Sequence, residues 1–280
     1  MKKISRRSFL AAAAVSAAAL ALTACGGSAS TASSAAASSV AASSEAASTS
    51  AAAAELTTVE AGKLTMATNA TFPPYEMTTD AGTIEGIDVD TAQAIAEKLG
   101  LELQIDDMDF DAALLSVQQG KADIAMAGIT VTDERMAVMS FSDSYATGIQ
   151  SVIVPEGSDI ASVDDLAGKK IGTQRGTTGY IYCSDDFGDD AVVAYDDGLT
   201  AVQALNNGQV DAVVIDNAPA KEFVAANPGL VILDTSYAEE DYAIGMAKGS
   251  SLEAAVNAAL EELKADGTLQ SIVDKYITAE

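Results

Sequence analysis

The strongest constraint on the fold is an alternation of strand and helix patterns that occurs twice along the chain. Residues 63–128 show these patterns in the order β-α-β-α-β, and residues 149–247 show a similar alternation. The segment DVDTAQAIAEKLG is typical of the helices, because apolar residues recur on one face and Gly100 follows as a stop signal. Strands that alternate with helices form parallel sheets covered by helices. The sequence therefore predicts two α/β units of similar size.

Two amphipathic helices follow the second unit, around SLEAAVNAALEELKADG and TLQSIVDKYI. The second unit has no strands left for these helices to cover, so we expect the chain to cross back and complete the first unit. The crossings are expected near residues 144–151 and 240–247. Two connecting strands of this kind form a hinge between two lobes.

The first 24 residues are typical of an export signal. MKKISRR is a basic n-region, and the apolar run FLAAAAVSAAALAL is short for a membrane span. The closing LTAC, which ends at Cys25, resembles the lipobox of bacterial lipoproteins, whose cysteine receives a diacylglyceryl group. The alternative is a plain signal peptide with an incidental cysteine. SRRSFL also resembles a twin-arginine export signal, and the Ala/Ser-rich residues 26–54 are expected to form a flexible tether.

The charge and composition exclude several classes of function. Without the leader, 11 basic residues stand against 41 acidic ones, a formal charge of −30. This charge argues against binding to nucleic acid or to an anionic lipid surface. The chain has no His, which removes His-based catalytic triads and the commonest zinc ligand, and it has no Trp. Cys183 has no cysteine to pair with if Cys25 is lipidated.

Seven motifs, in order, resemble the polar amino acid-binding family (family 3) of bacterial ABC-transporter solute-binding proteins over about residues 62–278. They are ATNATFPPYE (67–76), EGIDVDTAQAIAEKLG (85–100), MDFDAALLSVQQGKADIAMAGITVTDER (108–135), FSDSYA (141–146), DDLAGKKIGTQRGTTG (164–179), NGQVDAVVIDNA (207–218) and LKADGTLQSIVDKYI (263–277). The resemblance implies a two-lobed periplasmic-binding-protein fold of type II, the Venus-flytrap fold, with two hinge crossings. It also implies that the lobes close on a free L-amino acid, polar or charged, which is then delivered to a membrane permease.

The resemblance also implies how the chain is divided and where it works. A signal peptide (1–24) precedes a lipidated Cys25 and a linker (25–57). Lobe 1 comprises residues 58–146 plus 244–280, and lobe 2 comprises residues 147–243. We expect a monomer without cofactor, metal or catalytic residue, held by its lipid on the outer face of the cell membrane or on the periplasmic side of a Gram-negative envelope.

Arg135 is the candidate partner for the ligand's carboxylate. It follows the strand pattern KADIAM in the stretch AGITVTDER. A guanidinium can make two parallel bonds to a carboxylate and keeps its charge when buried. Thr132 followed by two acids is also typical of a helix N-cap, and Arg135 would then be an exposed helix residue. The resemblance favours a ligand role for Arg135 and Thr130, with Ala127 and Gly128 giving the ligand access to the backbone.

The other candidate residues surround the ligand in the resembling family. Asp216 ends the apolar strand DAVVID and is expected to bind the ammonium group, although it could instead be an N-cap. Gln174 and Thr178 are expected to line the second lobe's half of the cleft, and Thr178 to help bind the carboxylate. Phe72 and Phe110 are expected to form walls, although both could be core residues.

Two positions bear on ligand charge. Many relatives have Asp where this chain has Asn69, which removes one acid and disfavours a dibasic ligand. Asp88 lies where some binders of Lys or Arg place a pocket acid and could compensate. Two alternative functions stay open: a catalytic member of the fold, such as a dehydratase working with Asp or Glu, and a surface adhesin that reuses the fold.

Overall fold

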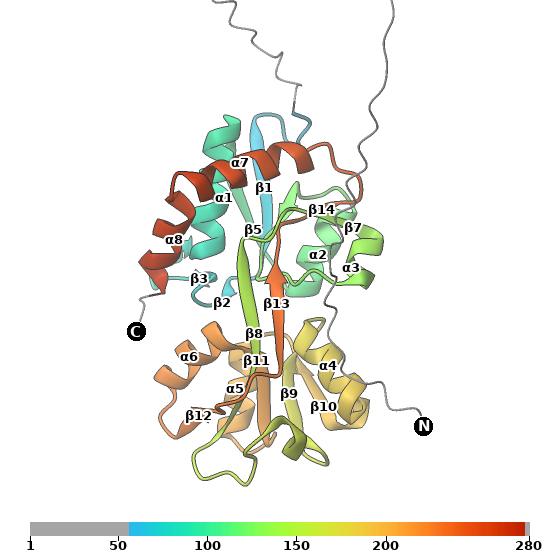
Figure 1. Cartoon of the computed structure of the whole chain (residues 1–280), viewed down its shortest axis with the longest axis vertical. Helices are drawn as coiled ribbons and strands as arrows, with labels where there is room; N and C mark the ends of the chain where they lie inside the picture. The colour runs from blue at the N-terminus through green and yellow to red at the C-terminus, as the bar shows by residue number, and fades with distance from the viewer. Residues whose placement is uncertain (1–55, 278–280) are drawn as a thin grey trace, which may run out of the picture. The chain divides into compact units, whose positions relative to one another are not determined.

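The structure is a computed structural model, and it describes residues 56–277. Its strands form two main sheets, one in each of two lobes, and a small third sheet (Figure 1). The predicted two-lobed α/β fold is confirmed. The predicted export signal, Cys25 and the predicted tether (26–54) all lie outside the described residues. No helix among residues 56–277 is long and apolar enough to cross a membrane.

The first lobe is built on a five-stranded sheet. In spatial order its strands are β5 (Glu102–Asp107), β1 (Lys63–Thr68), β6 (Ile124–Ala125), β14 (Gly245–Ala247) and β7 (Met139–Phe141). Strand β1 is parallel to β5 and to β6, as the alternation of strands and helices predicts. Strand β14 is antiparallel to both of its neighbours and comes from the C-terminal part of the chain. The chain therefore returns to complete this lobe.

Five helices belong to the first lobe. They are α1 (Ile87–Leu99), α2 (Phe110–Gln118), α3 (Asp133–Val138), α7 (Glu253–Ala265) and α8 (Thr268–Tyr276). Helix α1 ends at Gly100, whose left-handed φ of 70° lets its N–H reach the carbonyls of Ala96 and Glu97. The two C-terminal helices, α7 and α8, pack against α1. Helices α7 and α8, for which the second unit has no strands left to cover, thus cover the first lobe.

The second lobe is built on a six-stranded sheet. Its strands are β10 (Val192–Tyr195), β9 (Ile171–Gln174), β11 (Ala212–Asp216), β8 (Ala146–Pro155) and β12 (Leu230–Ile232) in spatial order, with β13 (Ala238–Tyr242) paired to β8. Strand β9 is parallel to β10 and β11. Strand β8 is antiparallel to β11, so the prediction of a parallel sheet is wrong for this strand. The reason is that β8 enters from the first lobe, not through a helical crossover.

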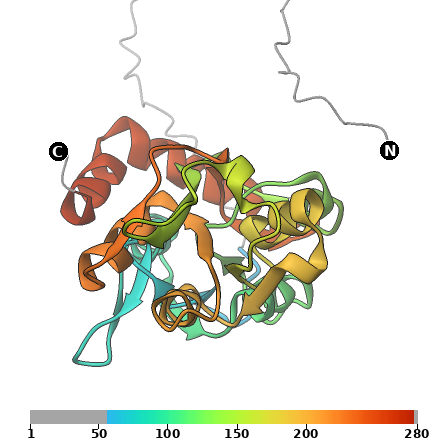
Figure 2. The same ribbon diagram turned by 90° about the horizontal axis from the view of Figure 1, so that it is seen from below.

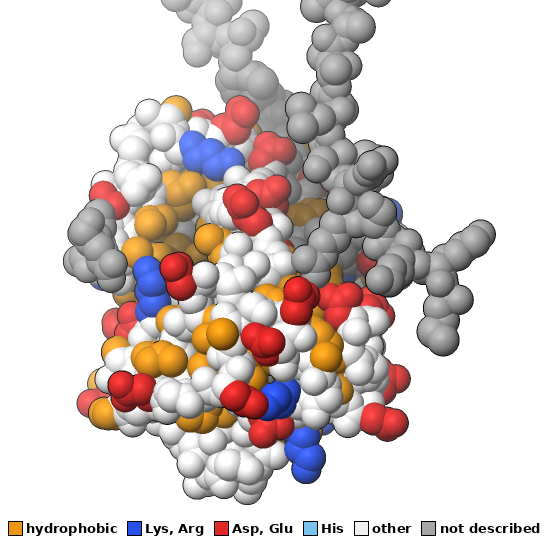
Figure 3. Space-filling model, turned by 60° about the horizontal axis from the view of Figure 1, so that its bottom comes forward, with side chains coloured by type: hydrophobic (Ala, Val, Ile, Leu, Met, Phe, Trp, Pro, Cys, Tyr) orange, Lys and Arg blue, Asp and Glu red, His pale blue; other side chains and the backbone are white. Residues whose placement is uncertain are grey.

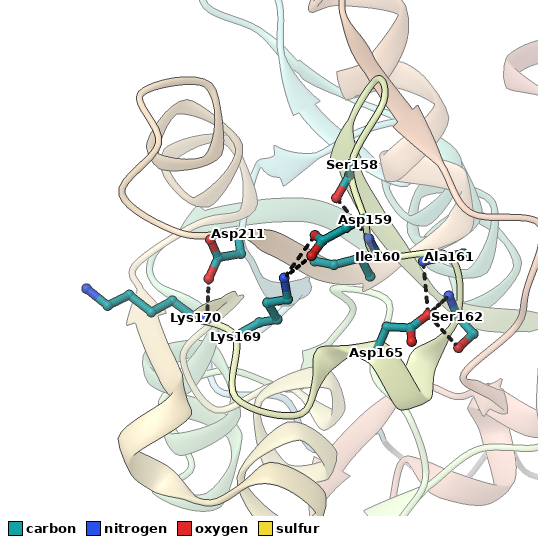
Figure 4. A network of polar contacts seen from close by, with 9 residues as sticks. All are labelled: Ser158, Asp159, Ile160, Ala161, Ser162, Asp165, Lys169, Lys170 and Asp211. Carbon is teal, nitrogen blue, oxygen red and sulfur yellow. Dashed lines mark hydrogen bonds and ion pairs between the residues drawn. The ribbon is translucent and has the colours of Figure 1, made fainter.

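Short and long helices cover the second sheet. They are the 3₁₀ helices η1 (Val163–Leu166) and η2 (Asp189–Ala191) and the α-helices α4 (Thr178–Phe187), α5 (Gly198–Asn206) and α6 (Asn217–Ala226). Figure 4 shows the polar network at the start of η1. The Asp165 carboxylate accepts from the Ser162 N–H at 2.9 Å, which completes a capping box. Nearby, Lys169 pairs with Asp159 at 2.8 Å.

Strands β8 and β13 lie side by side and join the two lobes (Figure 1). Their register runs from Ala146 opposite Tyr242 to Gln150 opposite Ala238. Strand β13 alternates in burial, with Glu240 and Tyr242 inward and Glu239 exposed. This pair is the hinge, and its inward side chains reach the space between the lobes.

A small antiparallel sheet stands at the edge of the first lobe. It contains β2 (Thr71–Phe72), β3 (Glu76–Thr78) and β4 (Ile84–Glu85). The cyan β3–β4 hairpin projects from the lobe when the structure is seen from below (Figure 2). At the base of this sheet, Phe72 lies opposite Glu76, and both side chains are buried. The small sheet therefore carries an aromatic ring and a carboxyl group toward the second lobe.

Candidate functional site

A cavity between the two lobes is lined by side chains from both of them. The first lobe contributes Asn69, Phe72, Glu76, Phe110, Ala127, Gly128, Thr130 and Arg135, and the second contributes Gln174, Thr177, Thr178 and Asp216. Strands β9 and β11 end at this cavity, which is where ligands of open α/β folds bind. The lining leaves room for little more than a water molecule, so a ligand enters only when the lobes separate.

Arg135 is buried in the cavity wall, with 8% of its surface exposed. Its backbone N–H donates to the N-cap hydroxyl of Thr132 at 3.2 Å. Its guanidinium donates to the Thr130 carbonyl at 2.7 Å and to the Gly176 carbonyl of the other lobe at 3.1 Å, and it lies over the ring of Phe110. Burial lowers the pKa of Arg135 from its ordinary value. The N-cap interpretation is correct for Thr132, but Arg135 is not an exposed helix residue.

Asp216 stands at the end of β11, where its carboxylate makes no cap bond to helix α6. One of its oxygens accepts from the Tyr242 hydroxyl, and the other accepts from Gln150 Nε2 at 2.8 Å. Burial raises the pKa of Asp216 to about 7, and the charge of Glu240 adds to this effect. Asp216 therefore occupies the N-cap position of α6, as the alternative interpretation expected, but its side chain does not cap the helix. It is a buried acid held by hinge residues beside the cavity.

Asn69 and Gln174 connect the two lobes directly. Gln174 Nε2 donates to Asn69 Oδ1 at 2.8 Å, and both side chains are buried. Asn69 Nδ2 donates to the Met108 carbonyl at 3.0 Å, which fixes the orientation of the amide. Asn69 therefore contributes a contact between the lobes in place of the charge that an Asp would bring.

Aromatic rings and backbone form the walls of the cavity. Phe72 and Phe110 are buried and both line it. Gly128 has a left-handed φ of 55°, and a Cβ atom there would lie 2.7 Å from Cε1 of Phe72. Only glycine fits this position without strain, and it brings the Phe72 ring onto the backbone. The buried Ala127 precedes it in the same wall.

Two fully buried carboxyl groups, Glu76 and Asp88, lie together at the first-lobe side of the cavity. Asp88 Oδ2 accepts from the Gly128 N–H at 3.0 Å and from the Tyr145 hydroxyl at 2.8 Å. The Glu76 carboxyl group meets that of Asp88, and neither of its oxygens accepts from an N–H or hydroxyl group among residues 56–277. Burial and the neighbouring Asp88 charge raise the pKa of Glu76 well above its usual range, and burial raises that of Asp88 to about 6.

The structure brings together ten of the eleven residues that sequence reasoning selected for the ligand. Asp88 is the exception, because it lies behind Gly128 and does not line the cavity. The ligand roles of all eleven residues stay predictions.

Sequence reasoning missed Glu76 and Thr177, which also line the cavity. The available signal for Glu76 was an acid four residues after Phe72 in an otherwise apolar run, FPPYEM.

A family model of bacterial extracellular solute-binding proteins, family 3, matches residues 64–279. The chain belongs to this family. It is a solute-binding protein of an ABC importer that binds an amino acid, and it is not an enzyme. The alternative of a catalytic member of the fold, such as a dehydratase, finds no support among the relatives.

The chain is also similar to individual relatives and solved structures of this family. The L-cystine-binding protein TcyJ of Escherichia coli (strain K12) is 32% identical over 226 residues, which cover 79% of this chain and 85% of that protein. The arginine-binding extracellular protein ArtP of Bacillus subtilis (strain 168) is 31% identical over 230 residues, which cover 78% and 87%. An ancestral arginine-binding protein bound to arginine has a TM-score of 0.74 and 41% identity, covering 77% of this chain and 98% of that one.

Proposed function

We propose that the amino acid bound by this protein is dibasic, with arginine the first candidate. The α-carboxylate pairs with Arg135 and the α-ammonium pairs with Asp216. These two contacts pair the one negative and the one positive charge that every free amino acid carries at its α-carbon. The first lobe still carries Glu76 in the cavity wall and Asp88 behind it, both without a basic partner. A buried carboxylate is costly unless it is paired, so the site favours a ligand with a second positive charge.

The state of Glu76 is the observation that carries this proposal. It is fully buried, it lines the cavity, and neither of its oxygens accepts from an N–H or hydroxyl group in the described part of the chain. A guanidinium or ammonium group on the ligand side chain supplies the missing donors. Glu76, four residues after Phe72, can thus supply the carboxyl group that an Asp in place of Asn69 would have supplied. The arginine-binding relatives support the same ligand class.

The acidity of the surface agrees with a cationic ligand. The chain carries 41 acidic residues, and acidic side chains are scattered over the face seen in Figure 3. A negative field raises the encounter rate of a cation at low ionic strength and loses its effect as salt is added. The field supports the proposed ligand class but does not distinguish arginine from lysine or ornithine.

A thermal-shift screen of the twenty amino acids, cystine and ornithine tests the proposal, with calorimetry for each hit. We expect arginine, lysine or ornithine to raise the melting temperature most. Glu76→Gln should weaken arginine binding at least tenfold while it preserves or improves the binding of citrulline, which is neutral. Glu102→Gln, at an exposed position of β5, is the matched control. Selective binding of cystine or glutamine by the wild type, with no response to arginine, would refute the dibasic assignment.

We further propose that the protein is lipidated at Cys25, acts as a monomer outside the cytoplasm, and delivers its ligand to the permease subunits of the importer. The lipobox-like LTAC and the basic n-region support lipidation. Cells that express the wild-type chain should incorporate labelled palmitate into it and retain it in the membrane fraction. Cys25→Ala should lose the label and enter the soluble extracytoplasmic fraction. Equal labelling of both forms would exclude Cys25 as the modified residue.

A further inference from the structure

Glu240 is a buried acid of the hinge that sequence reasoning did not select. It lies in β13 with 6% of its surface exposed, whereas its neighbour Glu239 is exposed. It does not line the cavity itself. An isolated buried carboxylate is unfavourable, so the donors that surround it indicate what it does.

A single oxygen of Glu240 collects donors from both lobes and from the hinge. Oε2 accepts from the hydroxyl of Thr130 in the first lobe at 3.2 Å and from that of Thr178 in the second lobe at 3.0 Å. It also accepts from Gln150 Nε2 on the facing hinge strand at 2.9 Å. The same Nε2 group donates to Asp216 at 2.8 Å. Glu240 is therefore connected to both threonines and, through Gln150, to the acid expected to bind the ammonium group.

These bonds determine what the two threonines can offer a ligand. A hydroxyl has one proton, and a carboxylate accepts but does not donate. When Thr130 and Thr178 donate to Glu240, they cannot also donate to the ligand's carboxylate. Each hydroxyl oxygen keeps a lone pair that can accept from an ammonium group, while Thr178 Oγ1 also accepts from Gln150 Nε2 at 3.4 Å. The carboxylate is then left to Arg135 and to backbone donors such as the N–H of Thr178, which begins helix α4 and has no partner within that helix.

We propose that Glu240 is a positioning residue that holds the hydroxyl protons of Thr130 and Thr178 and thereby makes both side chains acceptors for the ligand's α-ammonium group. This role differs from the expectation that the two hydroxyls help bind the carboxylate. Because the threonines belong to different lobes, their bonds to Glu240 form together only when the lobes are closed. The proposal rests on the proposed function only in that arginine, the proposed ligand, is chosen as the probe for the test.

The test compares arginine with 5-guanidinopentanoic acid, which is arginine without its α-ammonium group. Calorimetry gives the ratio of the two dissociation constants for each variant. Both probes carry the carboxylate and the guanidinium, so effects on those groups cancel in the ratio. We expect Glu240→Gln to reduce the preference for arginine at least tenfold and the exposed control Glu239→Gln to change it less than twofold. An unchanged preference in Glu240→Gln, or equal weakening of both probes, would overturn the proposal.

A double-mutant cycle separates positioning from simple attraction between charges. Thr130→Val combined with Thr178→Val removes both hydroxyls with little change in volume and should reduce the same preference. If Glu240 acts through these hydroxyls, adding Glu240→Gln to the double variant should change the preference less than twofold. Full additivity would mean that the Glu240 charge acts directly on the ligand, and the proposal would fail.

Two further outcomes are decisive. If Glu240→Gln does not fold, as judged by circular dichroism, the threonine double variant alone decides, and an intact preference there overturns the proposal. If the wild type binds another amino acid and not arginine, the dibasic assignment fails. The role of Glu240 is then tested with that amino acid and its deaminated analogue.

Discussion

The side chains of Asn69 and Gln174, 105 residues apart in the sequence, join the two lobes through a buried hydrogen bond of 2.8 Å. This bond exists only when the lobes are closed, so it contributes to the closed state alone. Gln174→Ala should weaken ligand binding three- to tenfold, as expected for about 0.5–1.5 kcal/mol from a neutral hydrogen bond. Calorimetry measures the affinity, and small-angle scattering at subsaturating ligand should show a larger mean radius of gyration.

The control for this variant is Gln203→Ala, which removes an exposed glutamine from helix α5 of the same lobe. It should change neither the affinity nor the scattering profile. Wild-type affinity in Gln174→Ala would mean that water replaces the lost contact without cost. The contact between the lobes would then contribute nothing to closure.

Arg135 and Arg175 offer a matched pair for testing the carboxylate site. They are the two arginines among residues 56–277, and Arg175 is largely exposed, with a weak contact of 3.8 Å to Asp196. Arg135→Ala should cost at least ~3 kcal/mol of binding free energy, because it leaves a buried ligand carboxylate unpaired. Arg175→Ala should change the affinity little, since exposed ion pairs contribute about 0–1 kcal/mol. Equal losses in the two variants would argue against Arg135 as the carboxylate partner.

Arg135 could be selected from the sequence as the carboxylate partner because its position and its chemistry both suit that role. It follows a strand in a chain with few basic residues, and a guanidinium suits a carboxylate. Its burial could not be read from the sequence, since Thr132 also forms the N-cap that would start an exposed helix. The contact with Gly176 across the cavity excludes an exposed helix residue, and the ligand role of Arg135 stays a prediction.

Glu76 and Glu240 show what local patterns do not reveal. Glu76 lies beside the cavity because β2 and β3 pair Phe72 with it, and such a short hairpin has no strong sequence pattern. Glu240 stands in the acidic run AEEDY, which is typical of an exposed segment. Its inward direction follows from strand alternation with Tyr242, but only once β13 is paired with β8. The pairing of strands in the tertiary structure determines where both acids lie, more than the local propensity of the sequence for a given secondary structure.

The stability of the ligand-free protein should decrease as the pH rises from about 4 to 7. Burial raises the pKa of Asp88 to about 6, that of Asp216 to about 7, and that of Glu76 well above its usual range. In this window the folded state binds more protons than the unfolded state, so the free energy of unfolding falls with pH. Each group contributes at most about 1.4 kcal/mol per pH unit. Urea unfolding at pH 5 and pH 8 measures the slope, which Glu76→Gln should reduce.

Arginine affinity should change with pH in the opposite direction. A cation beside Glu76 and Asp216 favours their ionised forms, so binding releases protons when the pH is below the pKa values of the free protein. The affinity should therefore rise between pH 5 and pH 8, by up to tenfold per pH unit for each proton released. Calorimetry at pH 6 in two buffers with different ionisation enthalpies counts these protons. A heat of binding that is the same in both buffers would show that no proton is released.

Gly148 and Tyr242 test the packing of the hinge against the site. A Cβ atom at Gly148 would lie 2.5 Å from Cε1, Cζ and the hydroxyl oxygen of Tyr242, whose ring is fully buried. The ring cannot move aside without disturbing Asp216, which accepts a bond from its hydroxyl. Gly148→Ala should therefore destabilise the protein by about 1–3 kcal/mol, the usual cost of overpacking, and weaken ligand binding.

Urea unfolding and calorimetry measure these two effects, and Thr147→Ala at the exposed neighbouring position is the control. Adding Tyr242→Leu to Gly148→Ala should recover part of the stability, because a smaller side chain makes room for the new methyl group. It should not recover the affinity, because Asp216 still lacks the hydroxyl that holds it. A loss of stability below about 0.5 kcal/mol in Gly148→Ala would show that the ring has space to move. The link from hinge packing to Asp216 would then not hold.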